Sequence, residues 1–278
     1  MIEIVRPGAS AAQAKVVIFD FDGTLSLIRS GWMSVMVPLC VEELARLGTG
    51  ETEQQLNAAV EEFVWRLTGK ETIYQMMALA DAIRARGGTP AEPLEYKKRY
   101  LDRLNLRIAH RLSSLRDRRA DAARYLVPGS RWLLEEFSRR GLILYLASGT
   151  DHANVKEEAE LLDIARYFGS CIFGAQDDLR SFSKAILVQR ILAQAGFHAA
   201  ELVVFGDGYV EIEEVKKAGG TAIGVATAEP DCLTVDDWKR KRLIEVGADF
   251  IIPNYLDFGE LERILFERAE RPEVAAVR

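Results

Sequence analysis

The sequence has few of the residues that build zinc sites and disulfide frameworks: 278 residues include three cysteines and three histidines. Cys40, Cys171 and Cys232 are far apart, so no two of them form the closely spaced pair that is typical of zinc sites and redox motifs. Their odd number also argues against a set of structural disulfides. We therefore expect free thiols and a cytoplasmic protein.

The sequence also lacks the features of membrane proteins and of nucleic-acid-binding proteins. No apolar run reaches the roughly 20 residues that a membrane-spanning helix needs. Met1–Ala14 contains no long apolar segment with a cleavage site, so we expect no secretory signal. The net charge of −6 gives no general argument for binding a nucleic acid. With 49% hydrophobic and 28% charged residues, the composition is that of a soluble globular protein.

Short apolar runs rich in β-branched residues alternate with helical patterns over much of the chain. The runs that predict strands are Lys15–Asp20, Leu142–Ala147, Cys171–Ala175, Leu202–Gly206, Thr221–Val225 and Asp249–Ile252. The patterns that predict helices are Ser130–Arg139, Asp151–Leu162, Ser183–Ala195, Tyr209–Ala218, Val235–Val246 and Asp257–Arg268. This alternation predicts an α/β protein with a Rossmann-like parallel sheet of about six strands, covered by helices on both faces.

The segment between the first and second predicted strands has a different pattern. It contains no convincing strand, and its apolar residues form four stripes at helical spacing. We therefore predict an all-helical domain of about 100 residues inserted into the α/β core. The predicted division is a core of residues 1–28 and 128–270, a helical insertion of residues 29–127, and a frayed tail of residues 271–278.

Several polar side chains follow the predicted strands at their carboxyl ends, where parallel sheets bind their ligands. Asp20 and Asp22 follow the first strand, Ser148 the second, and Asp207 the strand Leu202–Gly206. Three converging carboxylates repel one another unless a proton or a cation is present. Because all these ligands are oxygens, Mg²⁺ is favoured over zinc.

A hydroxyl, an ammonium group and backbone amides complete this set. Ser148 and Lys184 offer hydrogen bonds and a positive charge to the oxygens of a phosphoryl group. The backbone N–H groups that follow Ser148, at an expected helix N-terminus, add further donors for an anion. A carboxylate can then attack phosphorus while positive groups neutralise the developing charge.

Four segments of the sequence resemble the motifs of the haloacid dehalogenase-like superfamily, in the same order. They are DFDGTL at Asp20–Leu25, LASGT at Leu146–Thr150, SFSK at Ser181–Lys184 and VVFGDG at Val203–Gly208. The helical insertion after the first motif is similar to the cap of the phosphoglycolate phosphatase and β-phosphoglucomutase branch. The resemblance covers nearly the whole of the core.

The resemblance implies a role for each matching residue. Asp20 is then the nucleophile that becomes an aspartyl-phosphate, and Asp22 protonates the leaving oxygen and later activates water. Ser148 and Lys184 hold the phosphoryl oxygens. Mg²⁺ is held by Asp20, the backbone carbonyl of Asp22, and Asp207.

Glu211 stands where the family often has a second aspartate after the one that corresponds to Asp207. We expect Asp207 to bind the metal directly and Glu211 to act through a metal-bound water. The alternative is that Glu211 only favours the N-terminus of its helix through the helix dipole.

The substrate is expected to be a small phosphorylated metabolite, whose identity the sequence does not give. Gly149, Lys70 in the loop Thr68–Glu71, and Arg180 are candidate substrate-binding residues. The alternative for the loop is an ordinary connection between two helices. The sequence gives no indication of the oligomeric state.

A phosphatase that uses Mg²⁺ is therefore the leading hypothesis. A sugar phosphomutase on the same scaffold, which returns the phosphoryl group to a substrate hydroxyl, is the alternative. A non-catalytic module that binds a phosphorylated ligand is a third possibility, against which the intact set of Asp20, Asp22, Lys184 and Asp207 argues.

Overall fold

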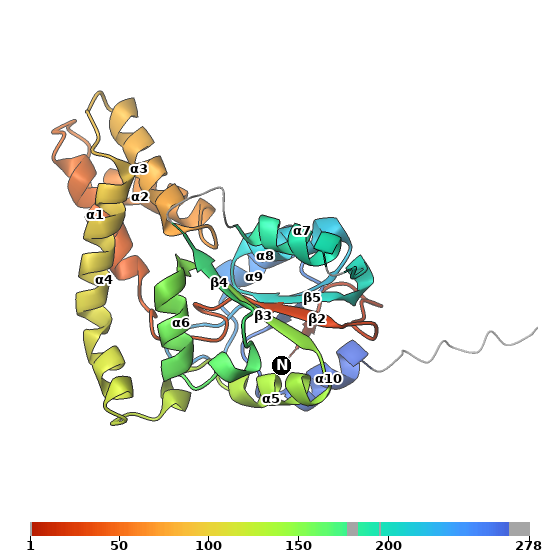
Figure 1. The fold of residues 1–278 in the computed structure, drawn as a ribbon. Helices are drawn as coiled ribbons and strands as arrows, with labels where there is room; N and C mark the ends of the chain where they lie inside the picture. The colour runs from red at the N-terminus through yellow and green to blue at the C-terminus, as the bar shows by residue number, and fades with distance from the viewer. Residues whose placement is uncertain (1, 177–182, 195, 267–278) are drawn as a thin grey trace, which may run out of the picture.

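The computed structural model describes residues 2–176, 183–194 and 196–266. In this part of the chain, seven strands form one sheet in the order β1-β7-β6-β5-β2-β3-β4 (Figure 1). The strands are β1 (Glu3–Ile4), β2 (Val16–Phe19), β3 (Ile143–Asp151), β4 (Ile172–Ala175), β5 (Leu202–Gly206), β6 (Thr221–Val225) and β7 (Phe250–Ile252). All neighbouring strands are parallel except β1, which pairs with β7 in the antiparallel sense.

Helices cover both faces of the sheet, because the strand residues are apolar on both sides. The core helices are α5 (Ser130–Arg139), α6 (His152–Leu161), α7 (Lys184–Gln194), α8 (Tyr209–Ala218), α9 (Asp237–Glu245) and α10 (Phe258–Phe266). In β2, Val16 and Ile18 pack in the apolar cluster with residues of α7 and α8, whereas Val17 and Phe19 pack in the cluster with residues of α5 and α10. The two clusters lie on opposite faces of the sheet, and the one that contains Val17 and Phe19 continues into the helical segment of residues 33–116.

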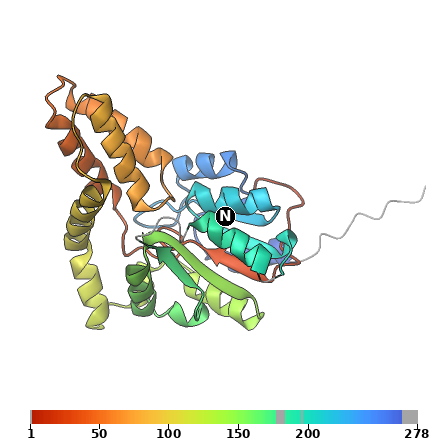
Figure 2. The same cartoon turned by 45° about the horizontal axis from the view of Figure 1, so that its top comes forward.

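A helical unit lies at one side of the sheet, beyond the carboxyl end of β2. Its helices are α1 (Met33–Ala45), α2 (Glu53–Arg66), α3 (Thr72–Ala85) and α4 (Pro93–Arg116). Helix α1 is continuous through Pro38, and α2 begins at a capping box formed by Thr52 and Gln55. In both ribbon views the four helices lie to one side of the layered core and against it (Figure 2).

The fold class predicted from the sequence is confirmed, with two differences. The first is β1, which adds an antiparallel edge strand to the six predicted strands. The second concerns residues 148–151, where the sequence predicts the start of a helix. Here β3 continues to Asp151, because Asp151 pairs with Ala175 of β4 across an irregularity in the ladder, and α6 begins at His152.

Within the described ranges, no helix has the length and apolar character that crossing a membrane requires.

Candidate active site

The order of the strands brings three of the four sequence motifs to one edge of the sheet, and Lys184 of the fourth reaches the same edge. Strand β2 lies between β3 and β5, so Asp20 after β2 is flanked by Ser148 in β3 and by Asp207 after β5. The register pairs Phe19 with both Leu146 and Phe205, so the three strands reach this edge together. The resulting site is built on backbone that the sheet holds in place.

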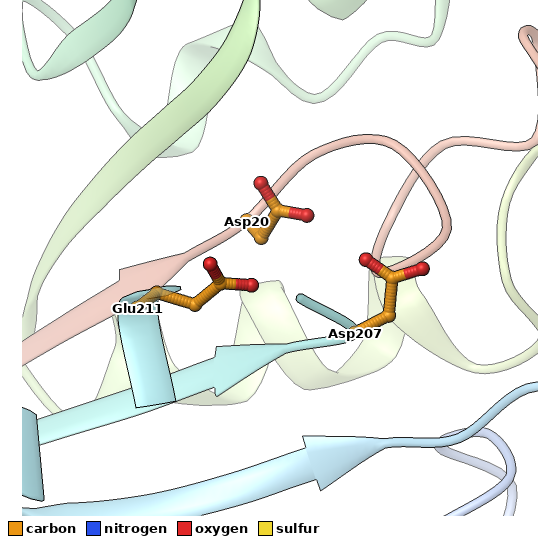
Figure 3. A group of neighbouring side chains, drawn as sticks. All are labelled: Asp20, Asp207 and Glu211. Carbon is orange, nitrogen blue, oxygen red and sulfur yellow. The ribbon is translucent and has the colours of Figure 1, made fainter. Parts of the chain in front are cut away.

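Three carboxylates meet at this edge. Ligand oxygens of Asp20, Asp207 and Glu211 all lie within 4.8 Å of one another. Figure 3 shows that their side chains come from the loop after β2, the end of β5 and the start of α8, and that they surround one space. Because α8 begins at Tyr209, its first turn directs Glu211 back towards the strand ends.

Lys184 joins two of these carboxylates. Its ammonium group donates to Asp20 Oδ1 at 2.6 Å and to Glu211 Oε2 at 2.8 Å, and all three side chains are buried. The other oxygen of Glu211 accepts a hydrogen bond from the backbone N–H of Gly208 at 2.9 Å. Lys184 therefore holds Asp20 and Glu211 in a fixed relation, and Glu211 stabilises the start of its own helix.

Burial and charge shift the proton affinities in this cluster. Burial raises the pKa of Asp20 well above its usual range, and the carboxylates of Glu211 and Asp207 raise it further while Lys184 lowers it. Burial alone would lower the pKa of Lys184, but the Asp20 and Glu211 carboxylates raise it above its usual value. Lys184 therefore stays protonated and pairs with two of the three carboxylates.

The cluster has the chemistry of a divalent-cation site. Its donors are carboxylate oxygens, which Mg²⁺ prefers to nitrogen and sulfur ligands. A cation among the carboxylates would offset their mutual repulsion, which adds to the effect of burial on the pKa of Asp20. Asp207 is also held from outside, because Lys239 donates to its Oδ2 at 2.9 Å and its backbone N–H donates to Thr24 Oγ1 at 3.0 Å. The residues present therefore fit a bound metal ion.

One carboxylate oxygen of Asp22 accepts hydrogen bonds, and the other has no hydrogen-bond partner among the described residues. Thr150 donates to its Oδ2 at 2.8 Å, and Ser148 donates to the same oxygen at 3.3 Å. Among the described residues, Asp22 Oδ1 is the one buried side-chain oxygen or nitrogen atom without a hydrogen-bond partner. Burial raises the pKa of Asp22, an effect that Arg29 opposes. A carboxylate of this kind can take up and release a proton.

A cavity of about 100 Å³ lies next to these side chains, and residues of the helical unit form one of its walls. The loop between α2 and α3 forms part of its wall through Thr68, Gly69 and Lys70. A Cβ atom on Gly149 would lie 2.9 Å from the carbonyl oxygen of Lys70, and one on Gly69 would lie 2.9 Å from the Cα atom of Gly208. The helical unit and the sheet edge therefore touch at backbone distance, which requires glycine at both positions.

A buried ion pair connects the entry to the helical unit with the core. Arg29 donates through Nε and Nη2 to Glu158 Oε1 at 3.1 and 2.7 Å, and both side chains are almost fully buried. Burial raises the pKa of Glu158 to about 7, although the Arg29 guanidinium lowers it. Arg29 also lines the cavity next to Asp22.

The structure brings together most of the candidate residues that the sequence suggested. The cavity is lined by Asp20, Asp22, Lys70, Ser148, Gly149, Lys184 and Asp207. Arg180 lies outside the described residues. Glu211, expected near the metal through water or at the helix N-terminus, belongs to the carboxylate cluster and pairs directly with Lys184.

Sequence reasoning missed four side chains of this site. Arg29, Gln75 and Tyr100 line the cavity, and Lys239 contacts Asp207. None of them belongs to a recognisable motif. Only Gln75 could have been suspected from the sequence, because it is a polar residue in an otherwise apolar helical segment that includes Met76. The structure shows that this side chain is buried.

Comparison with known proteins agrees with this geometry. The family model described as haloacid dehalogenase-like hydrolase matches residues 14–219. No curated protein matches the chain.

Several solved structures share the fold. A predicted phosphoglycolate phosphatase from Haemophilus somnus is 16% identical, with a TM-score of 0.58 over 90% of this chain and 98% of that chain. A conserved haloacid dehalogenase-like protein of unknown function from Agrobacterium tumefaciens is 20% identical, with a TM-score of 0.55 over 89% and 97%. A candidate β-phosphoglucomutase from Thermotoga maritima is 21% identical, with a TM-score of 0.52 over 90% and 100%.

Proposed function

The chain belongs to the haloacid dehalogenase-like hydrolases, and on that premise we propose that it is a Mg²⁺-dependent phosphatase of a small phosphorylated metabolite. The observation that carries the proposal is the arrangement of Asp20, Lys184 and Asp22 at the floor of one cavity. A buried carboxylate held by a lysine is next to a second carboxylate that has a free oxygen. These are the groups that a two-step phosphoryl transfer requires.

In the first step, Asp20 attacks phosphorus and the bond from phosphorus to the leaving oxygen breaks. Lys184 is positively charged and forms a hydrogen-bonded ion pair with Asp20. It therefore orients the carboxylate and offsets the negative charge of the phosphoryl oxygens. Asp22 donates its proton to the leaving oxygen, and an alcohol departs. The product of this step is an aspartyl-phosphate on Asp20.

In the second step, a water molecule attacks the phosphorus atom of the aspartyl-phosphate. Asp22, now ionised, accepts a proton from this water. The bond between Asp20 and phosphorus breaks, inorganic phosphate leaves, and both aspartates return to their first state. Thr150 and Ser148 fix the orientation of Asp22 through their hydrogen bonds to Oδ2, which leaves Oδ1 for the proton transfers.

Asp20, the backbone carbonyl of Asp22, and Asp207 are the residues that we propose to hold Mg²⁺. When bound, the ion neutralises charge on the carboxylates and on the phosphoryl oxygens. We propose that Glu211 positions Asp20 for metal binding, because both carboxylates accept a hydrogen bond from Lys184.

We further propose that residues 29–127 are a cap domain that closes the cavity, and that Lys70 and Gly149 contact the substrate. The close backbone approach of Gly69 and Gly149 to their neighbours supports this division of roles. A cap that closes over the cavity when substrate binds excludes bulk water from the reacting groups, which strengthens their electrostatic interactions.

The test is the release of inorganic phosphate from p-nitrophenyl phosphate by the purified chain, with Mg²⁺ and with EDTA. We expect turnover with Mg²⁺ and its loss with EDTA. An enzyme that converts a sugar monophosphate to its isomer without releasing phosphate would instead be a phosphomutase. Binding of phosphate without turnover in either assay would identify a binding module.

A further inference from the structure

Two polar side chains of the helical unit line the cavity and have no hydrogen-bond partner among the described residues. Gln75 in α3 and Tyr100 in α4 are each 4% exposed, and both line the cavity together with Asp22 and Arg29. Neither the amide of Gln75 nor the hydroxyl of Tyr100 is hydrogen-bonded in the described parts of the chain. Asp22 Oδ1 is the one fully buried unpaired side-chain atom of the described residues, so the polar atoms of Gln75 and Tyr100 open onto the cavity, where a ligand can reach them.

A neighbouring tyrosine shows that this situation is specific to the cavity. Tyr96, one turn earlier in α4, is equally buried at 2% exposure and does not line the cavity. Its hydroxyl accepts a hydrogen bond from the backbone N–H of Ala91 at 2.9 Å. The helical unit therefore satisfies the tyrosine that faces its own interior and leaves unpaired the one that faces the cavity.

The charged groups on the same wall already have partners. Arg29 uses Nε and Nη2 for Glu158, and the ammonium group of Lys70 lies 5.5 Å from the centroid of the Tyr74 ring, a cation–π contact. Asp22 and Glu158 add negative charge close to Arg29. In the described part of this wall, a second anionic group on the substrate would thus meet the negative charge of Asp22 and an arginine that is already paired with Glu158.

The hydrogen-bonding groups of Gln75 and Tyr100 restrict the chemical class of the ligand further. An amide and a phenol each donate and accept hydrogen bonds. A hydroxyl group also does both, so it can satisfy either side chain. A carboxylate only accepts, which leaves the amide carbonyl of Gln75 unpaired, and an apolar chain leaves both side chains unpaired. A ligand that leaves these polar groups unpaired loses binding free energy. This loss is the strongest means by which such a pocket can reject a ligand that lacks hydroxyl groups.

We propose that Gln75 and Tyr100 select phosphate monoesters of small uncharged alcohols that carry additional hydroxyl groups, that is, short-chain polyol phosphates. The inference rests on the proposed phosphatase function. It assigns selection between substrates to two cap residues outside the sequence motifs.

The test compares kcat/KM for three substrates of equal carbon number: glycerol 1-phosphate, n-propyl phosphate and 3-phosphoglycerate. We expect glycerol 1-phosphate to be the best of the three. In Tyr100→Phe and in Gln75→Leu, kcat/KM for glycerol 1-phosphate should fall by about 3- to 10-fold, the usual range for one neutral hydrogen bond. The value for n-propyl phosphate should stay unchanged or rise, because these variants remove polar groups that its apolar chain leaves unpaired. Tyr96→Phe is the matched control and should leave the ratio of the two substrates as in the parent chain.

Two results would overturn the inference and leave the phosphatase function intact. One is an equal loss on glycerol 1-phosphate and n-propyl phosphate in both variants. The other is a preference of the parent chain for 3-phosphoglycerate or n-propyl phosphate over glycerol 1-phosphate. Absence of any phosphate release, including from p-nitrophenyl phosphate with Mg²⁺, would instead reject the proposed function itself.

Discussion

Two walls of the cavity differ in how far their polar atoms are paired: the floor, formed by Asp20, Lys184 and Asp207 at the sheet edge, and the roof, formed by Lys70, Gln75 and Tyr100 of the helical unit. On the floor, nearly every charged atom is engaged: Lys184 connects Asp20 to Glu211, and Lys239 contacts Asp207. On the roof, Gln75 and Tyr100 are neutral and have no partner among the described residues. Side chains held in place by their own contacts suit a chemical step that is the same for every substrate. A roof with unsatisfied hydrogen-bonding groups suits the recognition of one substrate among many.

The largest expected effect lies on the floor. Asp20→Asn should reduce phosphate release on the order of 10⁴-fold or more, because an amide is a poor nucleophile and loss of a covalent nucleophile is among the most damaging changes to an enzyme. Steady-state assays with p-nitrophenyl phosphate measure this loss. Asp81→Asn, at an ion pair on the surface of α3, is the control and should be silent. An Asp20→Asn enzyme with most of its activity would contradict covalent catalysis at this residue.

A smaller effect should separate the metal-binding function of the floor from its chemistry. Glu211→Ala removes a carboxylate that shares Lys184 with Asp20, so we expect the Mg²⁺ concentration for half-maximal rate to rise by about 10- to 100-fold, as for other residues that support metal ligands. Activity should largely recover at saturating Mg²⁺. Glu213→Ala, in the same helix and paired with Lys217, serves as the control. Overlapping titrations for the Glu211 variant and the parent chain would leave Glu211 only the role of stabilising the helix N-terminus.

The smallest effect is expected on the roof. Lys70→Ala should raise KM for the physiological substrate, while hydrolysis of a small aryl phosphate changes little. This pattern follows if Lys70 contacts only the part of the substrate that is remote from phosphorus. Parallel measurements on both substrates give the answer. Equal losses on both would assign Lys70 to the phosphoryl group or to the structure of the loop, and the contrast between floor and roof would no longer hold for this residue.

The same contrast explains what the sequence could and could not predict. The floor was predictable because Asp20, Ser148 and Asp207 follow apolar runs, and parallel strands bring their carboxyl ends to one edge. Strand β1 was missed because two residues carry no periodicity. The extension of β3 through Gly149 was missed because a serine, glycine and threonine sequence is typical of a turn, and only the pairing with β4 keeps it extended.

The roof was less predictable, because its helices were evident but its functional side chains were not. Gln75 occurs in a stripe whose other members are buried for packing, and Tyr100 has the same spacing as the core residues Tyr96 and Leu104. Periodicity places such residues inside the fold without telling whether they face a core or a cavity. Arg29 and Glu158 are 129 positions apart, so their pairing depends on the tertiary structure.

The most direct test of the central claim is to trap the phosphorylated enzyme. With p-nitrophenyl phosphate, the leaving group needs little help from an acid, so Asp22→Asn should still permit attack by Asp20 but should slow the attack of water by about 10²- to 10⁴-fold. Rapid acid quenching of this variant with ³²P-labelled substrate should therefore give a stoichiometric, hydroxylamine-sensitive label on the peptide that contains Asp20. Turnover that continues with no label on that peptide would contradict a covalent mechanism.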